Sequence, residues 1–155
     1  IDIEVGDSEQ YALGNAVAKV MEVPGHTDGH IVYWFEESDA LFCGDTMFAM
    51  GCGKLSEGTA DQLWASLTKL TALPDETRIY CAHEYTQANG DFALSVEPSN
   101  QALVERMQEV DAKRAQGIST VPSLLGDERK TTIYWPGKAR CIECICRNSK
   151  AKRQL

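Results

Sequence analysis

The sequence lacks the features that mark membrane, secreted and nucleic-acid-binding proteins. No run approaches the ~18–20 consecutive apolar residues of a membrane span, and residues 1–4 lack the basic and then apolar order of a signal peptide. Cations are scarce over residues 1–126, which hold 7 Lys and Arg against 20 Asp and Glu. Because phosphate binding needs clustered cations, we expect no binding to nucleic acid, and the lack of a long apolar run predicts no membrane association.

What is present is typical of a globular protein. The 155 residues are 43% apolar and 25% charged, which suits one buried core. Without a secretory signal, the separate cysteines are predicted to be reduced thiols: Cys43, Cys52 and Cys81. The sequence therefore predicts a cytoplasmic protein, with the mitochondrial matrix as the alternative, and we expect a monomer.

The last 29 residues differ in composition from the rest. Residues 127–155 hold 8 Lys and Arg against 3 Asp and Glu, which favours a short solvated tail over a binding surface for anions. This tail contains Cys141, Cys144 and Cys146. Three sulfurs without a nearby His or a fourth Cys argue against a structural zinc site there.

Hydrophobic patterning predicts strands and one helix in the first half of the chain. Residues 17–23 alternate and then meet Pro24-Gly25, and the apolar runs 31–35 and 40–43 predict a hairpin buried on both faces. Residues 47–58 are predicted to form a loop. A helix is expected from a capping box at Thr59 and Gln62 to just before Pro74, followed by a strand over 78–81.

After residue 83 the pattern predicts helices only. One is expected over about 85–96, and a second from a cap at Ser99 or Asn100 to a stop at Gly117. From Val121 to the last residue the sequence shows no clear period.

Three polar residues follow predicted strands and are candidate metal ligands. His26 lies in a glycine-flanked turn, Asp45 ends the second apolar run, and His83 ends the strand over 78–81. Taken singly, each has a simpler interpretation: a hydrogen-bonded or surface His, or an Asp that caps a turn. Together they favour a metal site, because the ends of parallel strands converge on one edge of a sheet.

The order of motifs resembles one known family. Pro-Gly-His-Thr-x-Gly-His at 24–30, Leu-Phe-Cys-Gly-Asp-Thr at 41–46, Gly-Cys-Gly-Lys at 51–54, Glu-Gly-Thr at 57–59 and Tyr-Cys-x-His-Glu-Tyr at 80–85 are similar to glyoxalase II. This enzyme is the hydroxyacylglutathione hydrolase of the metallo-β-lactamase superfamily. Residues 92–98 and 120–123 resemble its helical C-terminal domain, so the likeness covers about residues 15–129.

The resemblance implies an α/β fold. It predicts the second half of a metallo-β-lactamase αββα sandwich over residues 1–83 and a small α-helical C-terminal domain over 84–130. Residues 131–155 then form an atypical basic, Cys-containing tail. The sequence resembles a fragment, because the family's first metal motif, His-x-His-x-Asp-His, would lie before residue 1.

The resemblance also implies roles for individual residues. His26 would bind the first of two divalent metal ions, Asp45 would bridge both, and His83 would bind the second. The metal is expected to be zinc, with iron or manganese as alternatives, and the site would be incomplete in this chain. Lys54 and Tyr85 would hold the glutathione moiety of the substrate. His30 matches a position that is not a ligand, so we expect it to be hydrogen-bonded near the turn.

The implied reaction is hydrolysis of the thioester S-(2-hydroxyacyl)glutathione, typically S-D-lactoylglutathione, by a metal-bound hydroxide. Its products are glutathione and a 2-hydroxy acid. Two departures from the family are Ser56, where a Tyr is usual, and residues 131–136, where an Asn-Pro-Phe-x-Arg segment is usual. The alternatives are a catalytically incompetent fragment or splice form of that enzyme, and a related sulfur dioxygenase of the same superfamily.

Overall fold

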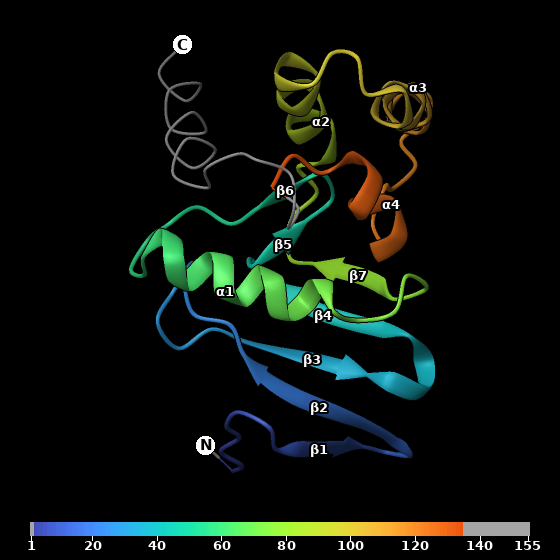
Figure 1. Ribbon diagram of the computed structural model, residues 1–155. Helices are drawn as coiled ribbons and strands as arrows, with labels where there is room; N and C mark the ends of the chain where they lie inside the picture. The colour runs from blue at the N-terminus through green and yellow to red at the C-terminus, as the bar shows by residue number, and fades with distance from the viewer. Residues whose placement is uncertain (1, 135–155) are drawn as a thin grey trace.

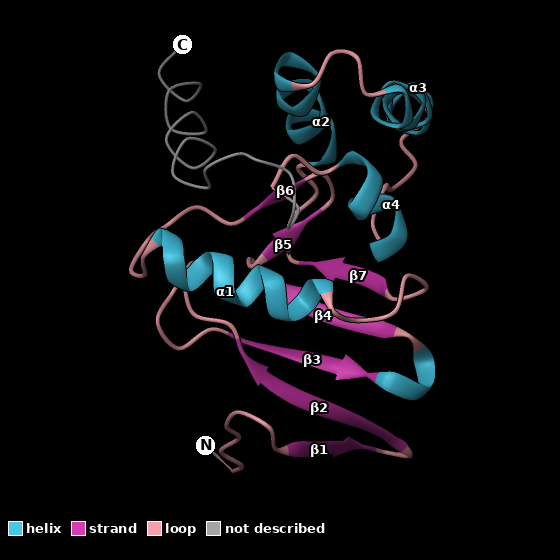
Figure 2. Ribbon diagram, in the orientation of Figure 1, coloured by secondary structure: helices cyan, strands magenta, loops and turns pink. Residues whose placement is uncertain are grey.

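A computed structural model describes residues 2–134 of the chain. One sheet holds six strands in the order β1-β2-β3-β4-β7-β8, and β5 and β6 form a separate short hairpin. Figures 1 and 2 show the succession from β1 through β2, β3 and β4 to β7. The strands are β1 Gln10–Leu13, β2 Ala16–Glu22, β3 Ile31–Phe35, β4 Ala40–Gly44, β5 Met47–Phe48, β6 Gly51–Cys52, β7 Arg78–Cys81 and β8 Ser123–Leu124. The helices are α1 Ala60–Thr71, α2 Thr86–Val96, α3 Gln101–Ala115 and α4 Leu125–Thr131, with a 3-10 turn η1 at Glu36–Ser38.

Helix α1 covers one face of the sheet (Figure 1). Its predicted capping box is confirmed: the Thr59 hydroxyl accepts from the Gln62 amide at 3.2 Å, and the Gln62 side chain accepts from the Thr59 amide at 2.7 Å. The apolar stripe of α1 and the strand residues beneath it are fully buried in one core: Leu63, Leu67, Leu70, Val32, Leu41 and Ile79. This packing fixes the strands that lead to the candidate ligands.

Strands β4 and β7 are parallel, as the metal-site hypothesis required. The Ala82 amide donates to the Gly44 carbonyl at 3.0 Å, which ties the two strand ends together. Asp45 and His83 are the residues that directly follow this joint. The predicted convergence of strand ends is therefore confirmed.

The hairpin of β3 and β4 is covered on one face only, so the prediction that it is buried on both faces is wrong for the described chain. Leu41 has no exposed surface, whereas its neighbour Phe42 is 46% exposed on the opposite face. An apolar run identifies a strand but does not reveal which element covers each of its faces.

Two further predictions were wrong. Residues 47–58 are not a plain loop, because β5 and β6 pair within them. The region after residue 83 is not purely helical, because β8 pairs antiparallel with β7 and α4 follows it at once. Such two-residue strands show no period of their own and exist through pairing with a partner.

Candidate metal centre

His26 is held on the turn after β2 with one ring nitrogen already in use. Gly25 has φ +141°, and a Cβ there would lie 2.6 Å from the Leu63 Cα, so only glycine fits between the turn and α1. The His26 Nδ1 lies 2.9 Å from the Lys54 carbonyl oxygen and donates to it. The ring is thereby fixed with Nε2 directed to Asp45, whose Oδ2 is 3.4 Å away.

Asp45 lies between the two candidate histidines. Its Oδ2 faces His26, while its Oδ1 lies 3.5 Å from the Nε2 of His83. Oδ1 is buried and accepts no hydrogen bond in the structure. A buried carboxylate oxygen that accepts no hydrogen bond is costly, so this oxygen is a candidate ligand for a cation.

The spacing of these atoms fits metal ligation better than direct hydrogen bonding. A charge-assisted N–H···O bond would bring nitrogen and oxygen to ~2.7–2.9 Å, closer than either contact. Two ligand atoms bonded at ~2.0–2.1 Å to one tetrahedral ion lie about 3.4 Å apart. With Nδ1 of His26 donating, its neutral Nε2 offers a lone pair to such an ion, as metal-binding histidines commonly do.

Asp45 presents a different carboxylate oxygen to each of the two histidines. Among residues 2–134, no three His, Cys, Asp or Glu side chains converge on a single point that could hold an ion. His26 and His83 instead face opposite oxygens of Asp45. The structure thus brings together all three predicted ligands in a pattern in which one carboxylate is shared.

His83 and Tyr85 lie side by side at the end of β7. Their rings stack with centroids 5.2 Å apart, and Phe48 packs edge-on against Tyr85 at 5.4 Å. Tyr85 is 44% exposed. The predicted substrate contact therefore has a free surface next to a candidate ligand.

Lys54 approaches the centre through its backbone. Its carbonyl fixes His26, while its side chain is exposed and makes no ion pair within the described residues. Gly53, just before it, lies so close to Asp45 that a Cβ would meet the Asp45 carbonyl oxygen at 1.9 Å. The Gly-Cys-Gly-Lys segment thus packs directly on the candidate ligands.

The β5–β6 hairpin that carries this segment is held from the helical region. The Met50 amide, on a residue with φ +55°, donates to Glu128 Oε2 at 2.7 Å, and Asn89 donates to the Ala49 carbonyl. The Tyr134 hydroxyl donates to the Gly51 carbonyl at 2.6 Å. Glu128 is fully buried and pairs with Arg106 at 2.6 Å, a support that sequence reasoning missed because these residues are far apart in sequence.

A second clamp joins the residue after His83 to the segment before β8. Glu84 accepts from both the amide and the hydroxyl of Thr120 at 2.7 Å and pairs with Arg114 at 3.1 Å. These hydrogen bonds hold the pKa of Glu84 below its ordinary value. The helices therefore brace the end of β7.

His30 is hydrogen-bonded near the turn, as predicted. Its Nε2 lies 3.3 Å from both the Cys43 carbonyl and the Asp45 amide, and its Nδ1 lies 3.5 Å from the Thr27 hydroxyl. The buried Cys43 thiol beside it has a pKa raised by desolvation. Cys43, Cys52 and Cys81 form no disulfide with one another, whereas the Cys141–Cys146 cluster lies outside the described residues.

Two models of known protein families match this chain. A model described as "Metallo-beta-lactamase superfamily" matches residues 1–83, more than half of the chain. The chain belongs to the metallo-β-lactamase superfamily. A second model, described as "Hydroxyacylglutathione hydrolase C-terminus", matches residues 84–142. The predicted family and α/β fold class are confirmed, while the division at residue 83 and the roles of single residues stay predictions.

Curated relatives carry the enzyme name that appears in the description of the second model. Hydroxyacylglutathione hydrolase from Methylococcus capsulatus is 56% identical over 134 residues, and that from Rhodospirillum rubrum is 57% identical over 134 residues. Each match covers 86% of this chain and 52% of the relative. The chain thus spans about half the length of these relatives.

Two solved structures share the fold. A metallo-beta-lactamase from Staphylococcus aureus aligns at TM-score 0.61 with 22% identity, over 91% of this chain and 37% of that one. ETHE1 from Myxococcus xanthus aligns at TM-score 0.61 with 22% identity, over 99% of this chain and 53% of that one. Among residues 2–134, no helix has the length and apolar content to cross a bilayer.

Proposed function

We propose that this chain contributes His26, Asp45 and His83 to a binuclear divalent-metal site that hydrolyses S-(2-hydroxyacyl)glutathione, such as S-D-lactoylglutathione. The products are glutathione and a 2-hydroxy acid. The observation that carries the proposal is the Asp45 carboxylate, which faces a histidine Nε2 on each side at 3.4 and 3.5 Å. The names of the relatives at 56 and 57% identity favour this hydrolase over the sulfur dioxygenase.

Each ligand has a defined task in the proposed site. Asp45 would be the ligand shared by both ions, and His26 and His83 would each supply one imidazole nitrogen. When bound, two such ions activate water as a nucleophile and polarise the thioester carbonyl. Nitrogen and carboxylate donors suit zinc, iron and manganese, and we propose zinc as the metal.

Lys54 and Tyr85 are proposed to hold the glutathione moiety. Glutathione carries two carboxylates, and the exposed Lys54 ammonium can pair with one of them. Lys54 follows Gly53, which contacts Asp45, while Tyr85 stacks on His83. Both substrate contacts thus belong to the segments that carry or touch the ligands.

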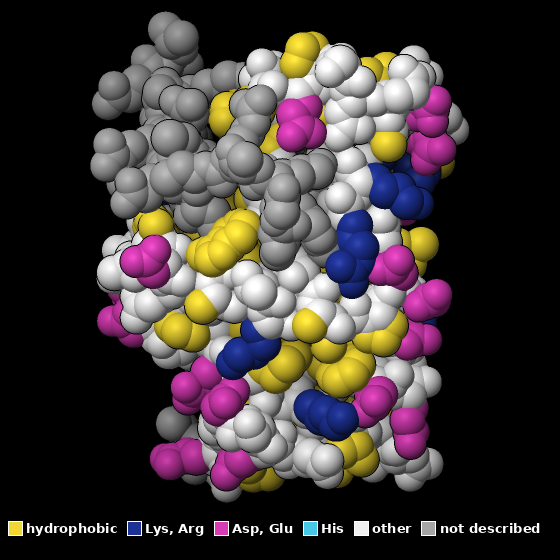
Figure 3. Space-filling model, in the orientation of Figure 1, with side chains coloured by type: hydrophobic (Ala, Val, Ile, Leu, Met, Phe, Trp, Pro, Cys, Tyr) yellow, Lys and Arg dark blue, Asp and Glu magenta, His cyan; other side chains and the backbone are white. Residues whose placement is uncertain are grey.

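Figure 3 shows the face of the molecule seen in Figure 1, on which Lys and Arg side chains are interspersed with Asp and Glu side chains.

Metal binding by the purified chain tests the proposal. The chain is equilibrated with zinc, and bound metal is measured by elemental analysis and by titration against a chelator. We expect Asp45→Asn to weaken zinc binding by more than the ~10–100-fold that loss of a hydrogen-bond partner of a metal ligand costs, because it removes the shared carboxylate itself. Asp91→Asn, on the exposed surface of α2, is the matched control and should bind zinc as the parent does.

Hydrolysis of S-D-lactoylglutathione is measured on the same samples. Turnover that falls with Asp45→Asn and not with Asp91→Asn supports the enzyme function. Metal bound without turnover would identify this chain alone as catalytically incompetent. Equal zinc binding by the parent chain and Asp45→Asn would overturn the proposed site.

A further inference from the structure

Glu128 lies in helix α4, outside the candidate metal centre, and has no exposed surface. Its Oε1 accepts from the Arg106 guanidinium at 2.6 Å, while its Oε2 accepts from the Met50 amide at 2.7 Å and from the Thr132 hydroxyl at 2.9 Å. Acidic side chains are almost never fully buried unless they are paired and their oxygens accept hydrogen bonds. The two oxygens of Glu128 thus join the helical region to the hairpin of β5 and β6.

The hairpin of β5 and β6 has little stability of its own. Its strands have two residues each, and an isolated two-stranded hairpin is marginally stable at best. Met50, in the turn between them, has φ +55°, a left-handed conformation that a residue with a side chain keeps only when its surroundings hold it there. Its amide donates to a charged acceptor, and such hydrogen bonds are roughly twice as strong as neutral ones. Glu128 therefore supplies a strong anchor at the strained turn.

The segment that leads from this turn to the candidate ligands is tightly packed. A Cβ on Gly51 would meet the Asn89 side chain at 2.3 Å, and a Cβ on Gly53 would meet the Asp45 carbonyl oxygen at 1.9 Å. Closely packed groups transmit a displacement instead of absorbing it. A shift of the turn therefore moves the segment as far as Lys54.

We propose that Glu128 is a positioning residue for the candidate metal centre. By accepting from the Met50 amide it fixes the hairpin and, through it, the Lys54 carbonyl that accepts from Nδ1 of His26 at 2.9 Å. Loss of this acceptor frees the His26 ring to rotate and to change tautomer, so Nε2 is no longer held toward Asp45. The consequence for metal binding rests on the proposed function, whereas the consequence for the His26 ring does not.

The ion pair of Glu128 with Arg106 has to be separated from the contact to Met50. Glu128→Gln alone does not separate them. Whichever way the new amide is turned, its NH₂ group faces either the Arg106 guanidinium or the Met50 amide, and both are donors. The substitution also leaves Arg106, whose side chain is 14% exposed, without its counter-charge. The test therefore removes the guanidinium from every variant that changes Glu128.

Two double variants isolate the contact to Met50. The first, Arg106→Met with Glu128→Gln, keeps an oxygen that can accept from the Met50 amide. The second, Arg106→Met with Glu128→Met, replaces that oxygen with a thioether, which is a weak acceptor. Both lack the ion pair, and neither leaves a buried charge unpaired. The difference between them therefore reports on the acceptor at residue 128.

The state of the His26 ring is measured first, without metal. Long-range proton–nitrogen NMR resolves the ring nitrogens of the three histidines, and the His26 signals are assigned by their loss in His26→Gln. We expect the proton to stay on Nδ1 in the parent and in the first double variant, and a mixture of tautomers in the second. The His30 signals are the internal control and should not change, because the partners of His30 lie outside the hairpin.

Zinc affinity is measured second, by titration against a chelator. Loss of a hydrogen-bond partner of a metal-binding histidine typically weakens metal binding by about 10–100-fold. We expect the second double variant to bind zinc about tenfold more weakly than the first. Equal His26 signals and equal zinc affinities in the two double variants would overturn the proposal. If the parent chain binds no zinc, the proposed function fails, and the His26 signals alone decide the role of Glu128.

Tyr134→Phe guards against double variants that fail to fold, which circular dichroism detects. The Tyr134 hydroxyl donates to the Gly51 carbonyl at 2.6 Å, so the substitution removes another anchor of the same hairpin and keeps the buried ring. We expect the His26 signals to change in the same direction as in the second double variant, and by less. Unchanged His26 signals in Tyr134→Phe would contradict the link from the hairpin to His26 and, with it, the proposal.

Discussion

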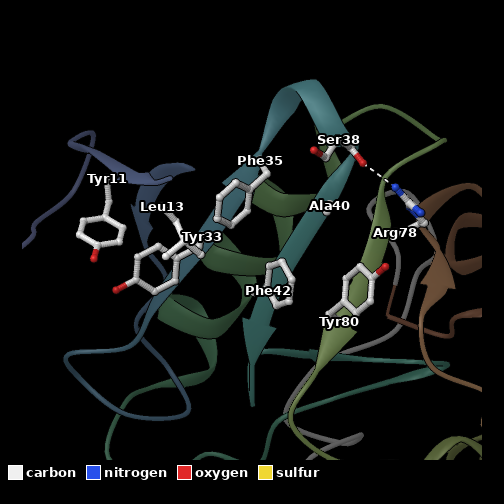
Figure 4. A pocket seen from close by; sticks show the side chains of 9 residues that line it. All are labelled: Tyr11, Leu13, Tyr33, Phe35, Ser38, Ala40, Phe42, Arg78 and Tyr80. Atoms are coloured by element: carbon white, nitrogen blue, oxygen red, sulfur yellow. Dashed lines mark hydrogen bonds between the residues drawn. The ribbon is translucent and has the colours of Figure 1, made fainter. Parts of the chain in front are cut away.

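The two faces of the sheet are built from neighbouring residues of the same strands, yet they differ in what covers them. On the α1 side, Leu41 and Ile79 are fully buried in the main core. One residue further along each strand, Phe42 and Tyr80 lie on the opposite face of the sheet and line a hollow there (Figure 4). Both faces carry apolar side chains, but the stability that each side chain supplies depends on whether another element covers it.

Truncation of two adjacent residues of β4 tests the difference between the two faces most directly. We expect Leu41→Ala to lower the free energy of unfolding by about 2–5 kcal/mol, because it removes a fully buried side chain and leaves a cavity. Phe42→Ala should cost clearly less, because nearly half of its side chain is already in water. Urea unfolding followed by circular dichroism measures both. Equal losses would contradict the assignment of one covered and one open face.

A smaller loss of stability is expected from a change in the cap of helix α1, which covers the sheet. Thr59→Ala removes the hydroxyl that accepts from the Gln62 amide and should destabilise the protein by about 0.5–2 kcal/mol. Its effect reports on how firmly α1 holds the covered face. Thr68→Ala, at an exposed position within α1, is the matched control and should change stability little. The thermal midpoints of the two variants are compared with that of the parent chain. Equal midpoints for Thr59→Ala and Thr68→Ala would contradict the role of the cap.

The candidate ligands were predictable because each follows a strand that hydrophobic patterning could locate. The parallel pairing of β4 and β7 then brings Asp45 and His83 together. The sequence analysis expected this, because the ends of parallel strands converge on one edge of a sheet. Backbone contributions were not predictable. The Lys54 carbonyl fixes His26, and Gly53 approaches Asp45 closely. Both contacts depend on the path of the loop backbone, which side-chain chemistry does not predict.

The elements that the sequence did not reveal depend on distant partners. Strand β8 exists because Ser123 and Leu124 pair with β7, and its two residues show no period. Glu128 looks like an ordinary helix-surface acid in the sequence, but it is buried against Arg106 and the Met50 amide. The exposure of Phe42 was not predicted, because the apolar runs of β3 and β4 favour burial on both sides and do not reveal which element covers each face.

The margin of the covered face gives the smallest expected effect. Lys19 pairs with Glu36 at 2.5 Å and lies 5.1 Å from the centroid of the Trp34 ring, with both charged side chains about half exposed. Because water screens such pairs, Lys19→Ala should lower the free energy of unfolding by less than about 1 kcal/mol, and the loss should shrink at high salt. Urea unfolding at low and high ionic strength measures it. A loss as large as that of Leu41→Ala would mean that the edge of the sheet, and not its covered centre, determines stability.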